Sequence, residues 1–155
     1  MENITKLLSK IDDQLSSETL NSFNDDFTDE EFNKFIALTN IEVTSDLIKL
    51  LKWKNGQKWN SILSPDNNRR LMSMNEIIET IKFYNDPMSE YLEPWEKCWV
   101  PILTNDSSDY VVYVSDGSNK GKLIGYWHND YDRKVEYNSI CDWALELIKD
   151  LSIVA

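Results

Sequence analysis

The side chains that most often carry out catalysis are scarce in this chain of 155 residues. Histidine occurs once, at His128, which excludes any site that needs two histidines, such as the zinc motif His-Glu-x-x-His. A cysteine nucleophile would have to pair His128 with Cys98 or Cys141, and neither cysteine is expected at a helix start or in a positively charged setting that would lower its pKa. The sequence contains no glycine-rich phosphate loop and no Gly-x-Ser-x-Gly elbow. We therefore expect no catalytic residue, no cofactor and no metal site, and a protein that is not an enzyme.

Carboxylates are abundant, and their abundance weakens the case for any particular pair. A glycosidase-type pair is not excluded, but no two acids are singled out by their surroundings. Asp25, Asp26 and Asp29 do not form a calcium loop, because the central glycine and the terminal bidentate glutamate are missing at the required spacing. Cys98 and Cys141 both lie beside Trp-containing apolar stretches, where we expect small buried hydrophobic residues without a disulfide.

Negative charge is distributed unevenly along the chain. There are 27 acidic and 16 basic residues, a formal net charge of −11, and residues 1–31 alone hold nine acids against two bases. Nucleic acids and anionic membranes would repel such a surface, so we expect neither as a direct partner. The charge favours a basic protein partner, although acidity also serves solubility alone in many proteins.

Six tryptophans are the least ordinary part of the composition. Trp99 and Trp143 stand within apolar runs, where we expect them in the core. Trp127 follows an apolar run just before a polar loop, and Trp59 stands in a polar stretch. These two are candidates for partial exposure and for binding a partner, with the sealing of core edges as the alternative role.

Helix caps and apolar spacing predict five helices that would position these residues. The first covers 2–16, and a capping box at 28–31 (Thr-Asp-Glu-Glu) opens a short helix that buries Phe32, Phe35 and Ile36. The third covers 46–54, with Thr44 or Ser45 as N-cap and Asn55-Gly56 as its stop. A second capping box at 73–76 opens a helix to about Tyr84, and Ser139 caps the last helix. The apolar positions of that last helix are Trp143, Leu145, Leu147, Ile148 and Leu151.

Strands are expected in the second half of the chain. The stretches 98–103, 110–114 and 122–127 are rich in β-branched and aromatic residues, and short polar turns separate them, which predicts an antiparallel meander. The polar stretch 61–70, which contains Pro65-Asp66-Asn67-Asn68, reads as a turn or loop. With no linker and no repeat, 1–155 reads as one domain with the N-terminal helix packed on it. The absence of a long apolar run and of a signal-peptide pattern predicts a cytoplasmic protein.

Several motifs follow one another in a characteristic order. A helix with Leu47, Leu50 and Leu51 precedes Asn55-Gly56, and Trp95 precedes Trp99-Val100-Pro101-Ile102. A turn ending in Asp109 leads to a strand ending at Asp116-Gly117, and then come Gly121, Gly125, His128, Ser139 and Trp143. This order resembles the SUKH superfamily, which includes the fungal cell-wall-assembly regulator and many bacterial immunity proteins, from about Phe32 to Leu151. Two positions depart from the family pattern: Ile41-Glu42-Val43-Thr44 replaces the usual Leu-Pro, and Ser108 replaces a common glycine.

The resemblance implies an α+β fold in which a twisted, mainly antiparallel sheet is flanked by helices, and it implies binding without catalysis. Many bacterial members resemble antitoxins that bind a toxin domain, often a basic nuclease, which agrees with the charge of this chain. We therefore expect an immunity protein with a basic cognate toxin as its partner. A regulatory scaffold like the fungal member, and a small-ligand or carbohydrate binder, are the alternatives. The expected toxin contacts are acids that attract basic groups and aromatic anchors: Asp25, Asp26, Asp29, Glu30, Glu31, Trp59, Trp127, Asp130 and Asp132.

Overall fold

Helices and strands of this protein segregate along the chain, as in α+β folds. The structure is a computed structural model, and it describes residues 3–39, 44–64, 68–86, 95–127, 130 and 132–154. The helices are α1 (Ile4–Gln14), α2 (Ser17–Asn21), α3 (Asp29–Thr39), α4 (Ser45–Trp53), α5 (Met74–Asn85) and α6 (Ile140–Val154). The strands are β1 (Arg70–Leu71), β2 (Trp99–Thr104), β3 (Tyr110–Val114), β4 (Leu123–Tyr126) and β5 (Val135–Tyr137). None of the described helices is long and apolar enough to span a bilayer.

The five strands form one antiparallel sheet in the order β1-β2-β3-β4-β5. The expected meander is confirmed as β2, β3 and β4, and the expected fold class is confirmed with it. Between Pro101 and Leu103 the register of β2 against β3 shifts, and this irregularity leaves both Ile102 and Leu103 in the main core. Two short strands were not expected: β1 comes from the stretch that the sequence predicts to be a loop, of which 65–67 lie outside the described residues.

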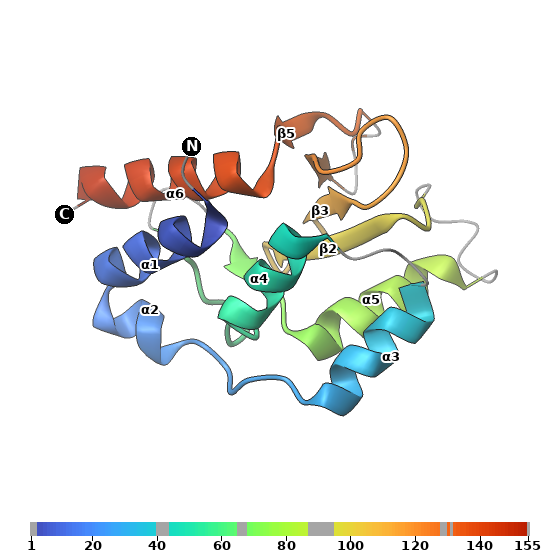
Figure 1. Cartoon of the computed structure of the whole chain (residues 1–155), viewed down its shortest axis with the longest axis horizontal. Coiled ribbons are helices and arrows are strands. Elements are labelled where there is room, and N and C mark those ends of the chain that lie inside the picture. The colour runs from blue at the N-terminus through green and yellow to red at the C-terminus, as the bar shows by residue number, and fades with distance from the viewer. Residues whose placement is uncertain are drawn as a thin grey trace.

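The helices cover one face of the sheet. In Figure 1, α1 runs alongside α6 and α3 alongside α5. The main core joins Ile4, Leu7 and Ile11 of α1 to Val100, Val111 and Leu123 of the sheet, and all six are at most 1% exposed. The N-terminal helix is therefore part of the same core as the sheet.

Aromatic side chains cover the opposite face of the sheet. Trp99, Val112, Val114, Ile124 and Tyr126 form a second buried cluster. The Trp95 ring lies over it, stacked on Tyr84 at 4.5 Å between centroids and edge-on to Tyr126 at 4.9 Å. Such pairs add stability beyond the area that they bury.

The predicted helix caps are present, whereas one helix was missed and some burial expectations differ from the structure. Thr44 is the N-cap of α4, and the Ser73 box is complete, since Ser73 Oγ accepts from the Glu76 amide and Glu76 accepts from the Ser73 amide. The five-residue helix α2 was missed because none of its side chains is buried, so it has no apolar stripe to detect. Among the apolar positions named for the last helix, Leu145 is 48% exposed, while Trp143 and Leu147 are buried. Both cysteines are half-buried, not fully buried as expected.

Candidate protein-binding site

The Asn55-Gly56 pair holds together three segments that are distant in sequence. Gly56 has a φ of +73°, and a Cβ there would lie 2.3 Å from the Ser73 amide nitrogen, so only glycine fits. Asn55 Oδ1 accepts from the Met74 amide at 2.8 Å, and Asn55 Nδ2 donates to the Asp25 carbonyl at 2.9 Å. Gly56 was expected to end the helix, and this expectation is wrong: α4 ends at Trp53, with Lys54 as its C-cap. Gly56 instead allows its backbone to approach the backbone of Ser73 closely.

Residues 22–25 and 55–58 run beside each other as an antiparallel ribbon. Phe23 bridges to Gln57, and the Lys58 amide donates to the Ser22 carbonyl at 2.8 Å. The buried Gln57 side chain donates to Ser22 Oγ and to the Ile62 carbonyl and accepts from the Leu71 amide. In this ribbon Asp25 lies beside Asn55 at one end, and Trp59 follows Lys58, which pairs with Ser22, at the other end.

Trp59 stands on a tight turn at the end of this ribbon, and its side chain is 73% exposed. Asn60 has a φ of 66°, which asparagine tolerates better than most residues. The Asn60 amide donates to Asp106 Oδ2 at 2.8 Å, and the Ser61 amide donates to the Lys58 carbonyl at 3.1 Å. The large Trp59 ring is therefore exposed to solvent on a turn whose backbone is fixed by hydrogen bonds.

Asp106 is itself fixed by Arg70, which is 2% exposed. Arg70 Nη2 lies 2.7 Å from Asp106 Oδ1 and 2.6 Å from Glu76 Oε2. Nε also donates to Asp106, and Nη1 donates to Glu76 Oε1 and to the carbonyls of Gln57 and Leu71. Burial alone would lower the pKa of Arg70, but the hydrogen bonds to the two carboxylates raise it. Burial alone would raise the pKa of Glu76 and of Asp106, yet the hydrogen bonds to Arg70 lower both. All three groups stay charged at neutral pH.

The expected acidic contacts follow the ribbon into α3. Four of them are exposed on the surface: Asp25, Asp26, Asp29 and Glu30. Glu31 is half-buried and its carboxylate accepts from the Thr28 amide and hydroxyl, which completes the expected capping box. Glu30 lies 3.8 Å from Lys34 in an exposed pair that contributes little. The first four acids are therefore available to a partner, whereas Glu31 already has a structural role.

The remaining expected contacts lie elsewhere. Trp127 is half-buried, with the Arg69 guanidinium 4.9 Å from its ring centre and Gly125 directly against the ring. Asp130 and Asp132 are exposed beyond it, and Asp132 lies 3.7 Å from Lys134. Figure 1 shows β5, which follows this loop, on the side of the molecule opposite the beginning of α3. The structure thus does not bring these three residues together with the acids of 25–30.

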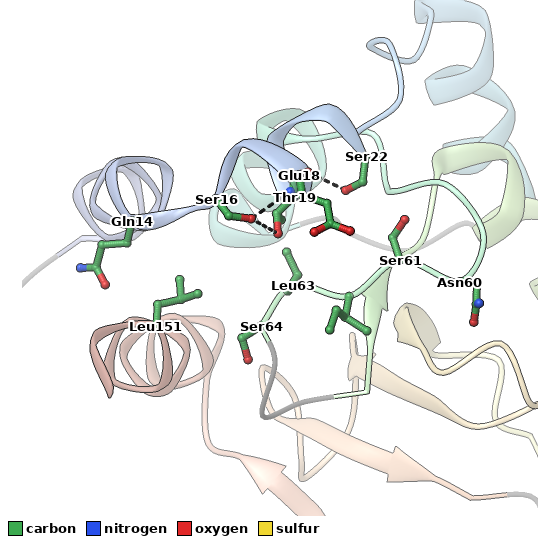
Figure 2. Close-up of a pocket in the computed structure, with 11 residues that line it drawn as sticks. Gln14, Ser16, Glu18, Thr19, Ser22, Asn60, Ser61, Leu63, Ser64 and Leu151 are labelled. Carbon is green, nitrogen blue, oxygen red and sulfur yellow. Dashed lines mark hydrogen bonds between the residues drawn. The ribbon is translucent and has the colours of Figure 1, made fainter. Parts of the chain in front are cut away.

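A hollow of about 540 Å³ opens between the N-terminal helices and the 60–64 segment (Figure 2). Buried Leu63 and Leu151 belong to its apolar part, and the Glu18 carboxylate extends from α2 toward the 60–64 segment. Its other lining residues are polar or exposed: Gln14, Ser16, Thr19, Ser22, Asn60, Ser61, Ile62 and Ser64. No local sequence pattern predicts this hollow, because three segments distant in sequence meet to form it.

The described cysteines do not have the environment of nucleophiles. Burial, reinforced by Glu96, raises the pKa of the Cys98 thiol, and burial with Asp46 raises that of Cys141. Cys141 does lie in the first turn of α6, contrary to the sequence expectation, but the carboxylates outweigh that position. Within the described ranges no three metal-ligating side chains gather. His128 lies outside the described residues.

Comparison with known families places the chain. The sequence model of the SMI1 / KNR4 family (SUKH-1) matches residues 26–146. A search of curated proteins gives no match. The matched range includes residues 55–58 of the ribbon, the whole sheet, and Arg70 with Glu76 and Asp106, which we call the Arg70 cluster. Helices α1 and α2 precede the matched range. The match supports a toxin-immunity or regulatory role in general, and over this range the chain belongs to the SMI1 / KNR4 family (SUKH-1).

Proposed function

We propose that this protein is an immunity protein, which binds a cognate basic toxin domain and neutralises it by occupying its surface without catalysing a reaction. The observation that carries the proposal is Trp59, a 73% exposed aromatic side chain on a turn fixed by Asp106 and Ser22. Large exposed aromatic residues on rigid backbone are the residues that most often dominate binding energy. Family membership supports a protein partner.

Charge supports a basic partner. The segment that leads from the ribbon into α3 exposes Asp25, Asp26, Asp29 and Glu30, and the chain carries a net charge of −11. A field of this sign accelerates encounter with a basic protein. The acids follow the end of the ribbon where Asp25 meets Asn55, and Trp59 follows the other end, so the two would act as separate contacts that fix the orientation of the partner. A nuclease that binds anionic nucleic acid has a basic surface of the required kind.

The test is co-expression with any toxin domain that the gene neighbourhood encodes. Wild-type protein should restore growth, and Trp59→Ala should bind the purified toxin roughly 30-fold or more weakly, the loss expected for a hot spot of about 2 kcal/mol. Charge reversal by Asp25→Lys with Asp26→Lys should mainly slow association. The matched control is Leu145→Ala, which removes an apolar side chain that is 48% exposed on α6.

The outcomes separate the candidate functions. Equal rescue by the wild type, the Trp59 variant and the Asp25/Asp26 variant would reject this surface. A gene neighbourhood without any toxin, together with absence of rescue, would reject immunity and favour the regulatory role. Thermal unfolding of each variant checks that its fold is retained.

A further inference from the structure

The hollow between α1, α2 and the 60–64 segment has the size of a ligand pocket and an uneven charge. Its volume of about 540 Å³ lies within the range of about 300–1,000 Å³ typical of binding pockets. Among the described residues that line it, Glu18 is the one that carries a charge. In Figure 2, Gln14 and Leu151 lie at one end, Asn60 lies at the other, and the Glu18 carboxylate stands between them. A cation entering the hollow would meet a carboxylate and no opposing base.

The uncharged part of the lining suits a long side chain with many donors. Leu63 and Leu151, both buried, offer apolar surface for an aliphatic stem. Hydroxyl and amide oxygens that can accept hydrogen bonds are spread along the lining from one end of the hollow to the other: Gln14, Ser16, Thr19, Ser22, Asn60 and Ser61. The Ser64 hydroxyl also lines the hollow; it is buried and makes no hydrogen bond within the described part of the chain. Unsatisfied buried groups of this kind call for a partner.

We propose that the hollow binds an arginine side chain presented on a loop of the protein partner. A guanidinium carries five donors in a planar fork, and one carboxylate together with several neutral oxygens can accept from most of them. A lysine ammonium, which is a compact point charge, would use fewer of these acceptors. The inference rests on the proposed function for the source of the loop, since Trp59 stands beside Asn60 at the edge of the hollow. Trp59 would supply much of the binding energy, and the hollow would provide specificity for a partner that presents an arginine.

The hollow lies partly inside and partly outside the range that matches the family. Its wall of 14–22 and Leu151 lie outside the matched range of 26–146, whereas Asn60 and Ser64 lie inside. A family scaffold and flanking helices therefore share one site. Partner selection through such a site would change with the flanking helices while the family core stayed the same.

The test uses two tripeptides that differ only in charge. Amide spectra of the full-length protein are titrated with acetyl-Gly-Arg-Gly-amide and with its citrulline counterpart, the neutral isostere. We expect the arginine peptide to shift the amides of Thr19 and Ser61 with a dissociation constant in the millimolar range, and the citrulline peptide to shift them little. Glu18→Gln should weaken the arginine peptide about tenfold or more, because it removes a charge-assisted contact. Glu146→Gln, an exposed acid on α6, should change nothing.

Each result decides something. Equal shifts with both peptides, or no shift with either, would overturn the arginine site. An equal response to acetyl-Gly-Lys-Gly-amide would show that the hollow accepts any basic side chain, and this result would overturn the assignment to a guanidinium. Toxin binding that is intact in Glu18→Gln rejects this inference and leaves the proposed function standing. Selective arginine binding without any rescue by the wild-type protein rejects the proposed function and leaves the pocket chemistry standing.

Discussion

Gly56 is the residue with the least room for change. It combines a left-handed backbone with a contact of 2.3 Å between a hypothetical Cβ and the Ser73 nitrogen. Gly56→Ala should therefore lower the free energy of unfolding by roughly 3 kcal/mol or more, as the sum of strain and a backbone clash. Chemical denaturation measures this loss.

Gly117 provides the matched control for Gly56. It has a φ of 90°, but nothing lies within 4 Å of its hypothetical Cβ. Gly117→Ala should cost only the conformational penalty, about 1–2 kcal/mol. Equal losses in the two variants would show that the close approach to Ser73 has no energetic weight.

Ser108 shows the opposite situation, a side chain where glycine would be more stable. The resemblance places a glycine at this position, and Ser108 here has a φ of 69°. Ser108→Gly should raise the free energy of unfolding by about 1 kcal/mol, because it removes left-handed strain from a non-glycine residue. Ser107→Gly, one position earlier in the same exposed turn, should give no gain. A loss of stability in Ser108→Gly would contradict the strain argument.

The turn that carries Trp59 depends on an element far from it in sequence. Asp106 lies in the β2–β3 connection and links the Asn60 amide to Arg70. Asp106→Ala should cost roughly 3–5 kcal/mol, because it leaves a buried guanidinium with one partner fewer. Hydrogen exchange of the Asn60 amide should accelerate more than that of other amides.

Asp116→Ala is the control for this coupling. Asp116 is an exposed acid in the β3–β4 connection, and its removal should change neither the stability nor the Asn60 exchange rate. Unchanged Asn60 protection in Asp106→Ala would show that the turn does not depend on Asp106.

Sequence patterns identified the elements with strong periodicity and missed those without it. The helices with apolar stripes, their capping boxes and the three central strands could be predicted, because burial of one face or both leaves a pattern in the residues. β1 has two residues and β5 three, and α2 buries nothing, so none of them leaves such a pattern. Apolar type alone did not separate exposed Leu145 from its buried neighbours on α6, because an apolar residue on an outer helix face has the same sequence signal as a core residue.

The exposure of candidate contact residues could be predicted only where it follows from the local sequence, and their role in binding stays a prediction. The exposure of Trp59 followed from its polar neighbours, and the acids of 25–30 from their own charge. Glu18, Asp106 and the hollow depend on contacts between distant segments, such as the bond from Asn60 to Asp106, which no local pattern encodes. Trp127, the other expected anchor, is half-buried with the Arg69 guanidinium 4.9 Å from its ring centre, and its role in binding stays a prediction.

At the scale of the whole molecule, the Arg70 cluster makes stability depend on pH. The pKa values of Glu76 and Asp106 are lowered in the folded state, below ordinary values of about 4.3 and 3.9. Their stabilising contribution is complete above those ordinary values and disappears as the pH falls through the lowered pKa values. The free energy of unfolding should fall steadily below about pH 5. Asp106→Asn should show a shallower fall; an equal slope would remove Asp106 as a cause.

The net charge of −11 leads to a prediction about association. The rate of association with a basic toxin should fall steeply between low and physiological salt, while the rate of dissociation changes little. Stopped-flow or surface measurements at several salt concentrations test this expectation. The Asp25→Lys, Asp26→Lys variant should show a weaker salt dependence. Association that is independent of salt would contradict electrostatic attraction.

The uneven exposure of the six tryptophans gives the molecule an optical probe of its own. Trp99 and Trp143 are buried, and Trp53, Trp95 and Trp127 are half-buried. Trp59 alone of the six is largely exposed. A neutral quencher such as acrylamide will therefore extinguish mainly the long-wavelength emission of one indole. Occupation of the Trp59 turn by any macromolecule would shield that indole and shift its emission to the blue, so binding can be followed without a label.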